Sequence, residues 1–123
     1  MNAQKVLLLE DEAIIAMDME MTLEAQGYKV LGPCQSVAEA QTVLENDTPD
    51  IALLDVNLGR EETSFSVAIK LHEMGVPIVF LSGYSPSVVD VPEQLTSMQR
   101  LTKPVNEGEL MAAIRQAGSL TPM

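Results

Sequence analysis

The chain has 123 residues, of which 46% are hydrophobic, so it is long enough for one globular core and too short for two comfortable domains. It carries 18 acidic against 7 basic residues, and 13 of the acids but only 3 of the bases lie within residues 1–62. This asymmetry argues against direct binding to nucleic acid or to an anionic membrane, because both need a basic footprint. It favours a basic partner or a cation, unless the acidity serves only to keep a small domain soluble.

No apolar run approaches the roughly 18 residues that a membrane span requires, and the N-terminal sequence lacks the pattern of a signal peptide. We therefore expect one cytoplasmic domain over residues 1–123, without an appended output domain. Cys34 is the only cysteine, so it cannot form an internal disulfide, and we expect a small, partly buried side chain rather than a redox or metal site.

Runs rich in valine, leucine and isoleucine alternate with stretches of helical pattern. The predicted strands are 5–10, 28–32, 50–55, 77–82 and 99–103. Most of these runs are continuously apolar, which is typical of strands covered on both faces. The predicted helices are 12–26, 36–46, 64–74 and 107–117. Regular alternation of strand and helix predicts an α/β fold with a doubly wound, five-stranded parallel sheet.

Local signals mark several helix ends. Ser36 and Glu39 have the spacing of a capping box, and Gly27 and Gly75 stand where helices should end. Segment 86–98 combines two prolines with β-branched residues, so we expect a short or irregular fourth helix there.

The polar residues that matter most are those at which the apolar runs stop, because ligands of an open parallel sheet bind beyond the carboxyl ends of its strands. Crowded carboxylates repel one another unless a cation joins them, and a hard oxygen-ligated ion such as Mg²⁺ suits such a set. With an ammonium and a hydroxyl nearby, the crevice could hold a phosphoryl group that a carboxylate oxygen attacks. The polar residues at which the apolar runs stop are Glu10, Asp11, Glu12, Asp55, Ser82 and Lys103.

Several other chemistries lack their parts. The sequence has no G-x-x-x-x-G-K-[ST] loop, no G-x-G-x-x-G turn and no G-x-S-x-G elbow. The single histidine, His72, falls in a predicted helix far from any strand end, and we expect it to be solvated rather than catalytic or metal-bound.

Taken together and in this order, these motifs resemble the receiver domain of bacterial two-component response regulators, over roughly residues 5–117. The resemblance implies a flavodoxin-like (βα)5 fold and a stand-alone response regulator. It makes Asp55 in "LLDVNL" the phosphoacceptor, Ser82 in "FLSGY" the switch hydroxyl, Lys103 in "LTKPV" the invariant lysine, and Glu10 and Asp11 in "LLLEDE" the acidic pair.

The resemblance also implies a cofactor site. The family's metal would take Asp11, Asp55 and the backbone carbonyl of Asn57, with Glu10 reaching it through water. The ion would be Mg²⁺, with Mn²⁺ as a substitute. The Lys-Pro peptide of such domains is typically cis, which suggests a cis bond after Lys103.

Two positions depart from the common pattern. Receivers commonly carry an aromatic switch residue three positions before the lysine, and Arg100 stands there in this chain. Tyr84 follows Ser82 by two residues, as in a receiver subgroup with a Gly-Tyr pair after the switch hydroxyl. Our hypothesis is that Tyr84 takes over part of the aromatic signalling role; alternatively its ring only packs on the neighbouring loop.

The first predicted helix has two apolar stripes. Ile15, Met19 and Leu23 should face the core, and a second stripe of Ile14, Met17 and Met21 lies beside it. Methionine-rich surfaces often receive partners, and the resemblance suggests a kinase's helical domain. Burial of each methionine at the edge of the core is the simpler expectation.

The function predicted from the sequence is that of a single-domain response regulator. Asp55 would accept a phosphoryl group from a sensor histidine kinase or histidine phosphotransfer protein, and the change would alter affinity for a downstream protein. The protein would then catalyse only its own phosphorylation and dephosphorylation. The alternatives are a binding module of the same fold that is never phosphorylated, or an aspartyl-phosphate phosphohydrolase.

Overall fold

The computed structural model describes residues 3–59, 62–83 and 91–119. Its one sheet contains five parallel strands in the order β2-β1-β3-β4-β5, which confirms the predicted fold class. The strands are β1 (Lys5–Leu9), β2 (Lys29–Cys34), β3 (Ile51–Asp55), β4 (Ile78–Ser82) and β5 (Gln99–Thr102).

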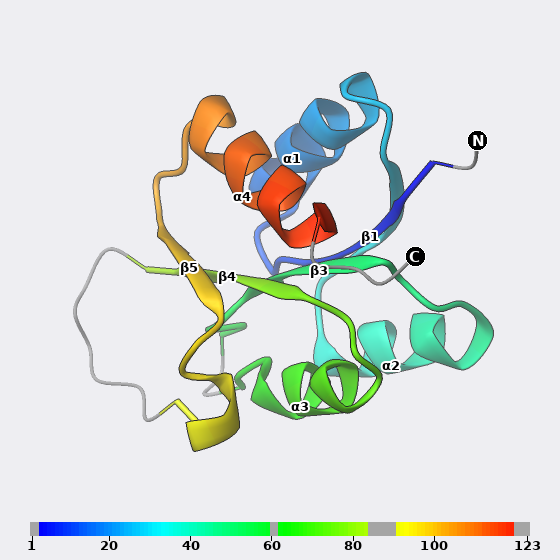
Figure 1. The fold of residues 1–123 in the computed structure, drawn as a ribbon, viewed down its shortest axis with the longest axis vertical. Helices are drawn as coiled ribbons and strands as arrows, with labels where there is room; N and C mark the ends of the chain where they lie inside the picture. Colours follow the sequence, from blue (N-terminus) through cyan, green and yellow to red (C-terminus); the bar gives the residue numbers. More distant parts are fainter. Residues whose placement is uncertain (1–2, 60–61, 84–90, 120–123) are drawn as a thin grey trace.

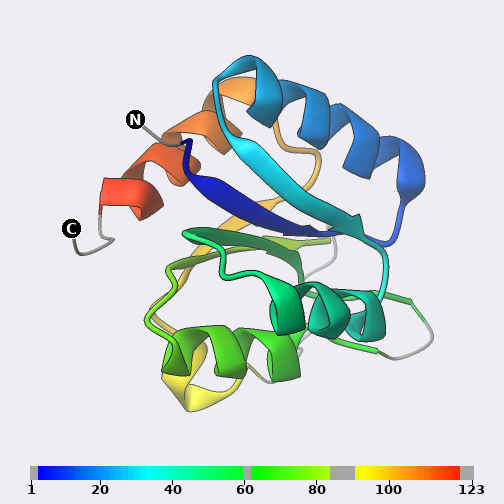
Figure 2. The same cartoon turned by 90° about the vertical axis from the view of Figure 1, so that its right-hand side faces the viewer.

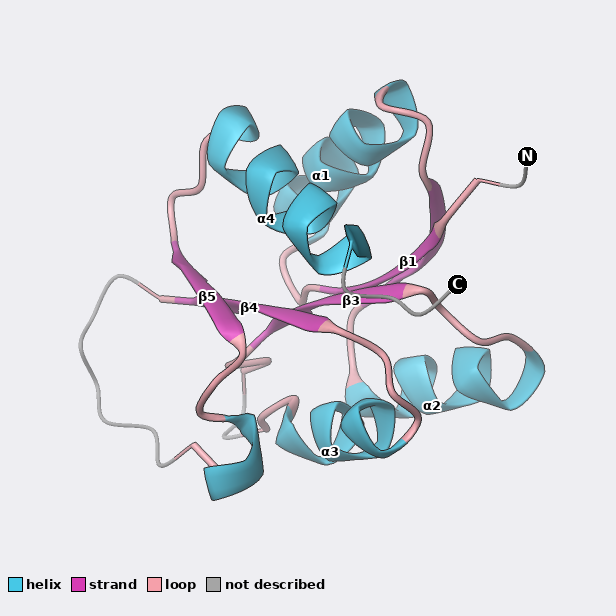
Figure 3. Ribbon diagram, in the orientation of Figure 1, coloured by secondary structure: helices cyan, strands magenta, loops and turns pink. Residues whose placement is uncertain are grey.

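Four α-helices cover the sheet in two layers (Figure 1, Figure 2). Helices α1 and α4 lie on one face, and α2 and α3 lie on the other. The helices are α1 (Ala13–Ala25), α2 (Val37–Asn46), α3 (Phe65–Glu73) and α4 (Glu107–Ser119), with a short 3₁₀ helix, η1 (Glu93–Leu95), before β5. Figure 3 shows the three layers coloured by type of element. No helix of the described segments is long and apolar enough to cross a membrane.

Two hydrophobic cores explain why the strands read as continuous apolar runs. Leu7 and Leu9 of β1 pack in the core beneath α2 and α3, while Val6 and Leu8 pack in the core beneath α1 and α4. All four are fully buried. Because successive side chains of a strand point to opposite faces, a strand covered on both sides has no position left for a polar residue.

The predicted helix limits are largely correct. The Ser36 hydroxyl accepts the Glu39 N–H at 3.2 Å, which is the first half of the expected capping box, whereas Glu39 accepts the N–H of Gln35, one residue before the cap, at 3.4 Å. Gly27 and Gly75 follow α1 and α3 with positive φ, as expected of glycines that end helices.

The segment between β4 and β5 agrees with the short or irregular element expected within 86–98, because its described residues contain only the three-residue helix η1. Strand β2 differs from the expectation: it runs further, to Cys34, with a shift in register. Cys34 is accordingly 2% exposed, more buried than expected, and burial raises the pKa of its thiol to about 11.

Helix α1 corrects one expectation. Met19 and Leu23 are buried and Ile15 is half-buried, as the core stripe requires. Met17 and Met21, however, are 59% and 67% exposed, so the expectation that they are buried at the edge of the core is wrong. The core beneath α1 and α4 takes Met19 and Leu23 but neither Met17 nor Met21.

Candidate functional site

Three carboxylates meet at the carboxyl end of the sheet. Strands β1 and β3 are neighbours in register, so Glu10 and Asp55, which follow Leu9 and Leu54, lie side by side. Each of Glu10, Asp11 and Asp55 offers an oxygen, and these oxygens all lie within 4.8 Å of one another. Glu10 is 0% exposed and Asp55 is 4% exposed, whereas Asp11 is partly exposed. The sequence expectation that strand ends bring these acids together therefore holds.

Lys103 supplies the positive charge of this cluster. Its Nζ lies 2.7 Å from Asp55 Oδ2 and 2.7 Å from Glu10 Oε1. The residue directly follows β5, and its backbone N–H donates to the Ser82 carbonyl at 2.9 Å, which fixes it to the end of β4. The Lys103–Pro104 peptide is cis, as the sequence resemblance implied.

Burial and charge set the protonation of the cluster. The pKa of Glu10 is raised to about 7: burial is the main cause, a hydrogen bond with Asp55 adds to it, and Lys103 offsets part of the rise. Burial alone would lower the pKa of Lys103, but its contacts with Asp55 and Glu10 outweigh this and raise it. Lys103 is therefore charged at neutral pH, while Glu10 is poised between its two forms.

Between β3 and α3, residues 56–59 pair antiparallel with residues 62–64; these two segments are called the hairpin below. The Leu58 N–H donates to the Glu62 carbonyl at 2.9 Å, and the Ser64 N–H donates to the Val56 carbonyl at 3.1 Å. Gly59 has φ +80, and a Cβ added there would lie 3.4 Å from Asp11 Oδ2. Gly59 thus lies beside the Asp11 carboxylate.

This hairpin orients the backbone of Asn57. Asn57 and Thr63 lie opposite each other between these two hydrogen bonds and form a non-hydrogen-bonded antiparallel pair, because neither donates to the other. In such a pair both backbone groups of a residue point outward, away from the partner strand. The Asn57 N–H donates to Asp55 Oδ1 at 3.3 Å. The Asn57 carbonyl therefore points to the same side as the carboxylates.

Of the remaining sequence candidates, Ser82 lies on β4, Arg100 on β5 and His72 on α3. Ser82 ends β4, half-buried, and faces Thr102 in register. Arg100 is exposed on β5, opposite Phe80, so a guanidinium stands where receivers commonly place an aromatic ring. Tyr84 lies outside the described residues. His72 is exposed on α3, as expected.

The sequence matches the response regulator receiver domain family over residues 6–115. The chain belongs to this family. It is 31% identical to the transcriptional regulatory protein PdtaR of Mycobacterium tuberculosis and 29% identical to the phyllosphere-induced regulator PhyR of Methylorubrum extorquens. Each alignment covers 94% of this chain, but only 57% of PdtaR and 43% of PhyR. The chain thus spans about half the length of these relatives.

Solved structures agree with this assignment. SdrG from Sphingomonas melonis Fr1 is 34% identical, with a TM-score of 0.78 over 92% of this chain and 94% of SdrG. A response regulator receiver protein from Sinorhizobium medicae WSM419 is 26% identical, with a TM-score of 0.79 over 98% of both chains. Receiver domains are signalling modules of two-component systems that interact with kinases or phosphotransfer proteins and with effectors.

The acidic cluster of this receiver domain fits the Mg²⁺ that the family binds. Its donors are hard oxygens from Glu10, Asp11 and Asp55, the kind that Mg²⁺ prefers. The outward carbonyl of Asn57 adds a neutral oxygen on the same side. Burial, and next to it the Asp55 carboxyl, raise the pKa of Glu10, and a cation bound here would favour the charged form of Glu10.

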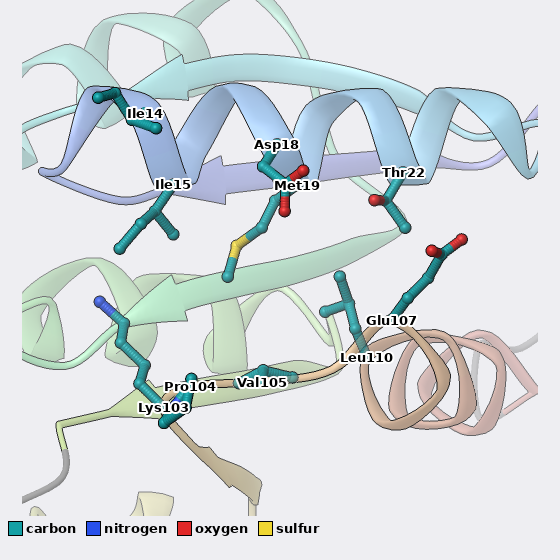
Figure 4. Close-up of a pocket in the computed structure, with 10 residues that line it drawn as sticks. All are labelled: Ile14, Ile15, Asp18, Met19, Thr22, Lys103, Pro104, Val105, Glu107 and Leu110. Atoms are coloured by element: carbon teal, nitrogen blue, oxygen red, sulfur yellow. The ribbon is translucent and has the colours of Figure 1, made fainter.

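A groove beside the cluster was not foreseen from the sequence. It has a volume of about 430 Å³ and lies between α1 and the segment that joins β5 to α4 (Figure 4). Asp18 and Thr22 of α1 point toward it from above, and Lys103 belongs to its wall. Asp18 and Thr22 are four residues apart in the predicted helix, so spacing alone could have placed them on one face. Only the tertiary structure shows what this face meets.

Proposed function

We propose that this receiver domain accepts a phosphoryl group on Asp55 from a phosphohistidine of a histidine kinase or histidine phosphotransfer protein. The observation that carries this proposal is the environment of the Asp55 carboxylate. Lys103 binds its Oδ2, the Asn57 N–H binds its Oδ1, and two further carboxylates lie within reach of a shared cation. An aspartate held in this way is fixed in orientation and is partly neutralised by Lys103.

The proposed metal ligands are Asp11, Asp55 and the Asn57 carbonyl, with Glu10 acting through water. Bound Mg²⁺, or Mn²⁺ in its place, would neutralise charge on the phosphoryl oxygens during transfer. Glu10 would lose its proton as the cation binds, because the cation supplies the positive charge that the buried site lacks.

The chain's own residues would do the rest. An Asp55 oxygen forms a bond to phosphorus while the phosphorus–nitrogen bond to the donor imidazole breaks. Lys103 already contacts both buried carboxylates and would follow the new phosphoryl charge. Ser82 at the end of β4 would donate a hydrogen bond to a phosphoryl oxygen, and its movement would remodel the segment 83–100. Water later attacks the acyl phosphate, so the domain would catalyse only its own phosphorylation and dephosphorylation.

We further propose that Tyr84 and Arg100 take part in the switch. Arg100 is solvent-exposed on β5, so it is free to meet an acidic partner whose affinity changes on phosphorylation. If Tyr84→Ala left the phosphorylation-linked change in the NMR spectrum and the partner affinity intact, Tyr84 would have no role.

The kinase or phosphotransfer protein would dock on α1. Ile14, Met17 and Met21 form an exposed apolar stripe, and the sequence of α1 carries acidic but no basic side chains. This surface suits a helix that presents apolar residues flanked by lysine or arginine. Ile14 also lines the groove beside Lys103, so a helix on this stripe would lie next to the edge of that groove.

Incubation with Mg²⁺ and acetyl phosphate, followed by intact-mass measurement, tests the proposal. The wild-type chain should gain the mass of one phosphoryl group, and Asp55→Asn should gain none. Asp47→Asn, at the opposite end of the sheet in an ion pair with Lys5, is the matched control and should behave as the wild type. No gain on the wild type, or an undiminished gain on Asp55→Asn, would contradict the proposal.

Two other functions would give different results. A receiver-like binding module would gain no mass and would bind its partner equally well with Asp55 or asparagine. A phosphohydrolase would turn over small phosphate esters, but such enzymes usually need a second carboxylate two residues after the nucleophile, and this chain has Asn57 there.

A further inference from the structure

Glu62 joins two segments that are distant in the sequence. Its backbone belongs to the hairpin, where its carbonyl accepts the Leu58 N–H and its N–H donates to the Gly59 carbonyl at 2.9 Å. Its side chain leaves the hairpin, and Oε1 accepts the Val37 N–H at 3.3 Å. Val37 is the first residue of α2, so the contact ties the hairpin to the start of that helix.

The start of α2 is a firm anchor for such a tie. The Ser36 hydroxyl caps the helix by accepting the Glu39 N–H, and Val37 packs against the core beneath α2 and α3. The Val37 N–H belongs to the first turn, where helix amides lack an intrahelical partner and where the helix dipole favours a carboxylate. Glu62 therefore satisfies an amide that the helix itself leaves open.

The hairpin in turn carries the backbone of Asn57. The outward direction of the Asn57 carbonyl depends on Asn57 and Thr63 staying opposite each other, between the two flanking hydrogen bonds. One of those bonds ends on the Glu62 carbonyl. A shift of Glu62 would consequently loosen the geometry that aims the Asn57 carbonyl at the site.

We propose that Glu62 is a positioning residue: its contact with Val37 holds the hairpin and thereby pre-aligns the Asn57 carbonyl for Mg²⁺. This inference rests on the proposed function for the role of Asn57. The contact acts through geometry, so a neutral side chain of the same length with an acceptor oxygen should replace the carboxylate. Glutamine meets that requirement and alanine does not.

Binding of Mg²⁺, measured by calorimetry without any phosphodonor, gives the first readout. Glu62→Ala should weaken Mg²⁺ binding by about 3- to 10-fold. This is less than the loss of a residue that hydrogen-bonds a metal ligand directly often costs, because the Asn57 carbonyl is only one of several proposed ligands. Glu62→Gln should bind Mg²⁺ within about 2-fold of the wild type. The Asn57 amide signal in NMR should shift in Glu62→Ala and stay in place in Glu62→Gln.

The rate of phosphorylation by acetyl phosphate, followed over a range of Mg²⁺ concentrations, gives the second readout. Glu62→Ala should raise the half-saturating Mg²⁺ concentration by the same factor and leave the maximal rate unchanged. Glu39→Ala is the matched control, because it removes another carboxylate from the start of α2 without touching the hairpin. Its Mg²⁺ affinity should equal that of the wild type.

Other outcomes would overturn the inference. Wild-type Mg²⁺ affinity in Glu62→Ala would show that the contact does not position the site. Equal weakening in Glu39→Ala would assign the effect to the stability of α2, and equal change in Glu62→Gln would assign it to charge. Absence of phosphorylation in the wild type would contradict the proposed function alone, because the calorimetric comparison needs no phosphodonor.

Discussion

The centre and the edge of the sheet bring their functional groups to the site in different ways. Strand β3 is buried at every residue, and Asp55 is its last one. Strand β5 alternates half-buried and exposed residues, and Lys103 follows it directly. The carboxylates therefore stand on a rigid support, whereas the ammonium that binds them comes from an edge strand with less packing to hold it. A change of charge at Asp55 should therefore displace β5 and Lys103 more readily than it displaces β3.

Truncation of one core leucine on each strand tests this contrast most strongly. Leu53→Ala should lower the free energy of unfolding by about 4 kcal/mol, because Leu53 is fully buried and leaves a cavity. Leu101→Ala on β5 should cost about 1 to 2 kcal/mol, because Leu101 is only partly buried. Urea denaturation measures both values, and equal losses would remove the distinction between centre and edge.

The link between the two regions is the contact of Lys103 with the buried carboxylates. Lys103→Met should destabilise the protein by about 3 kcal/mol at neutral pH in EDTA, since it removes the ammonium that pairs with the buried Asp55 carboxylate. Added Mg²⁺ should restore part of the loss. Lys70→Met, at an exposed position of α3, should change stability by less than about 0.5 kcal/mol. If Mg²⁺ did not change the stability of Lys103→Met, that result would count against a shared cation site.

The pH dependence of stability reports on Glu10. The pKa of Glu10 rises from 4.5 to about 7 on folding, so between these values the folded protein holds a proton that the unfolded chain has released. Without divalent cations, the free energy of unfolding should therefore fall by roughly 3 kcal/mol as pH rises through this window. Asp47, whose pKa is lowered from 3.8 by Lys5, acts below the window.

Glu10→Gln should flatten this slope, because glutamine does not titrate. Thermal denaturation between pH 5 and pH 8 in EDTA measures the effect in both proteins. A slope that persists in Glu10→Gln would place the titrating group elsewhere.

The smallest effect on stability is expected on the outer face of α1. Met17→Gln should change the free energy of unfolding by less than about 0.5 kcal/mol, because the side chain is 59% exposed. Phosphotransfer from a cognate kinase should nevertheless slow, while phosphorylation by acetyl phosphate stays unchanged. Met19→Gln, which places an amide in the core, is the contrasting variant and should unfold more easily. Unchanged transfer in Met17→Gln would separate this stripe from kinase docking.

Much of the fold was predictable because its signals are local. Continuous apolar runs give strands covered on both faces, and the strand-end rule then brings Glu10, Asp55 and Lys103 together without knowledge of their contacts. The helix cap at Ser36 needed only spacing. The family resemblance supplied what spacing does not carry, including the cis peptide after Lys103.

The sequence by itself determined the order of elements, the sheet and the acids at its carboxyl end, since periodicity and composition encode which residues are buried. Only the tertiary structure decided how those residues are held. The contact of Glu62 with Val37 spans 25 residues of sequence, and the exposure of Met17 and Met21 depends on what covers α1. The pairing of Asn57 with Thr63 likewise leaves no mark in the apolar pattern of the sequence. Such features depend on which surfaces meet in the folded protein, and the pattern of apolar and polar residues along the sequence does not encode those contacts.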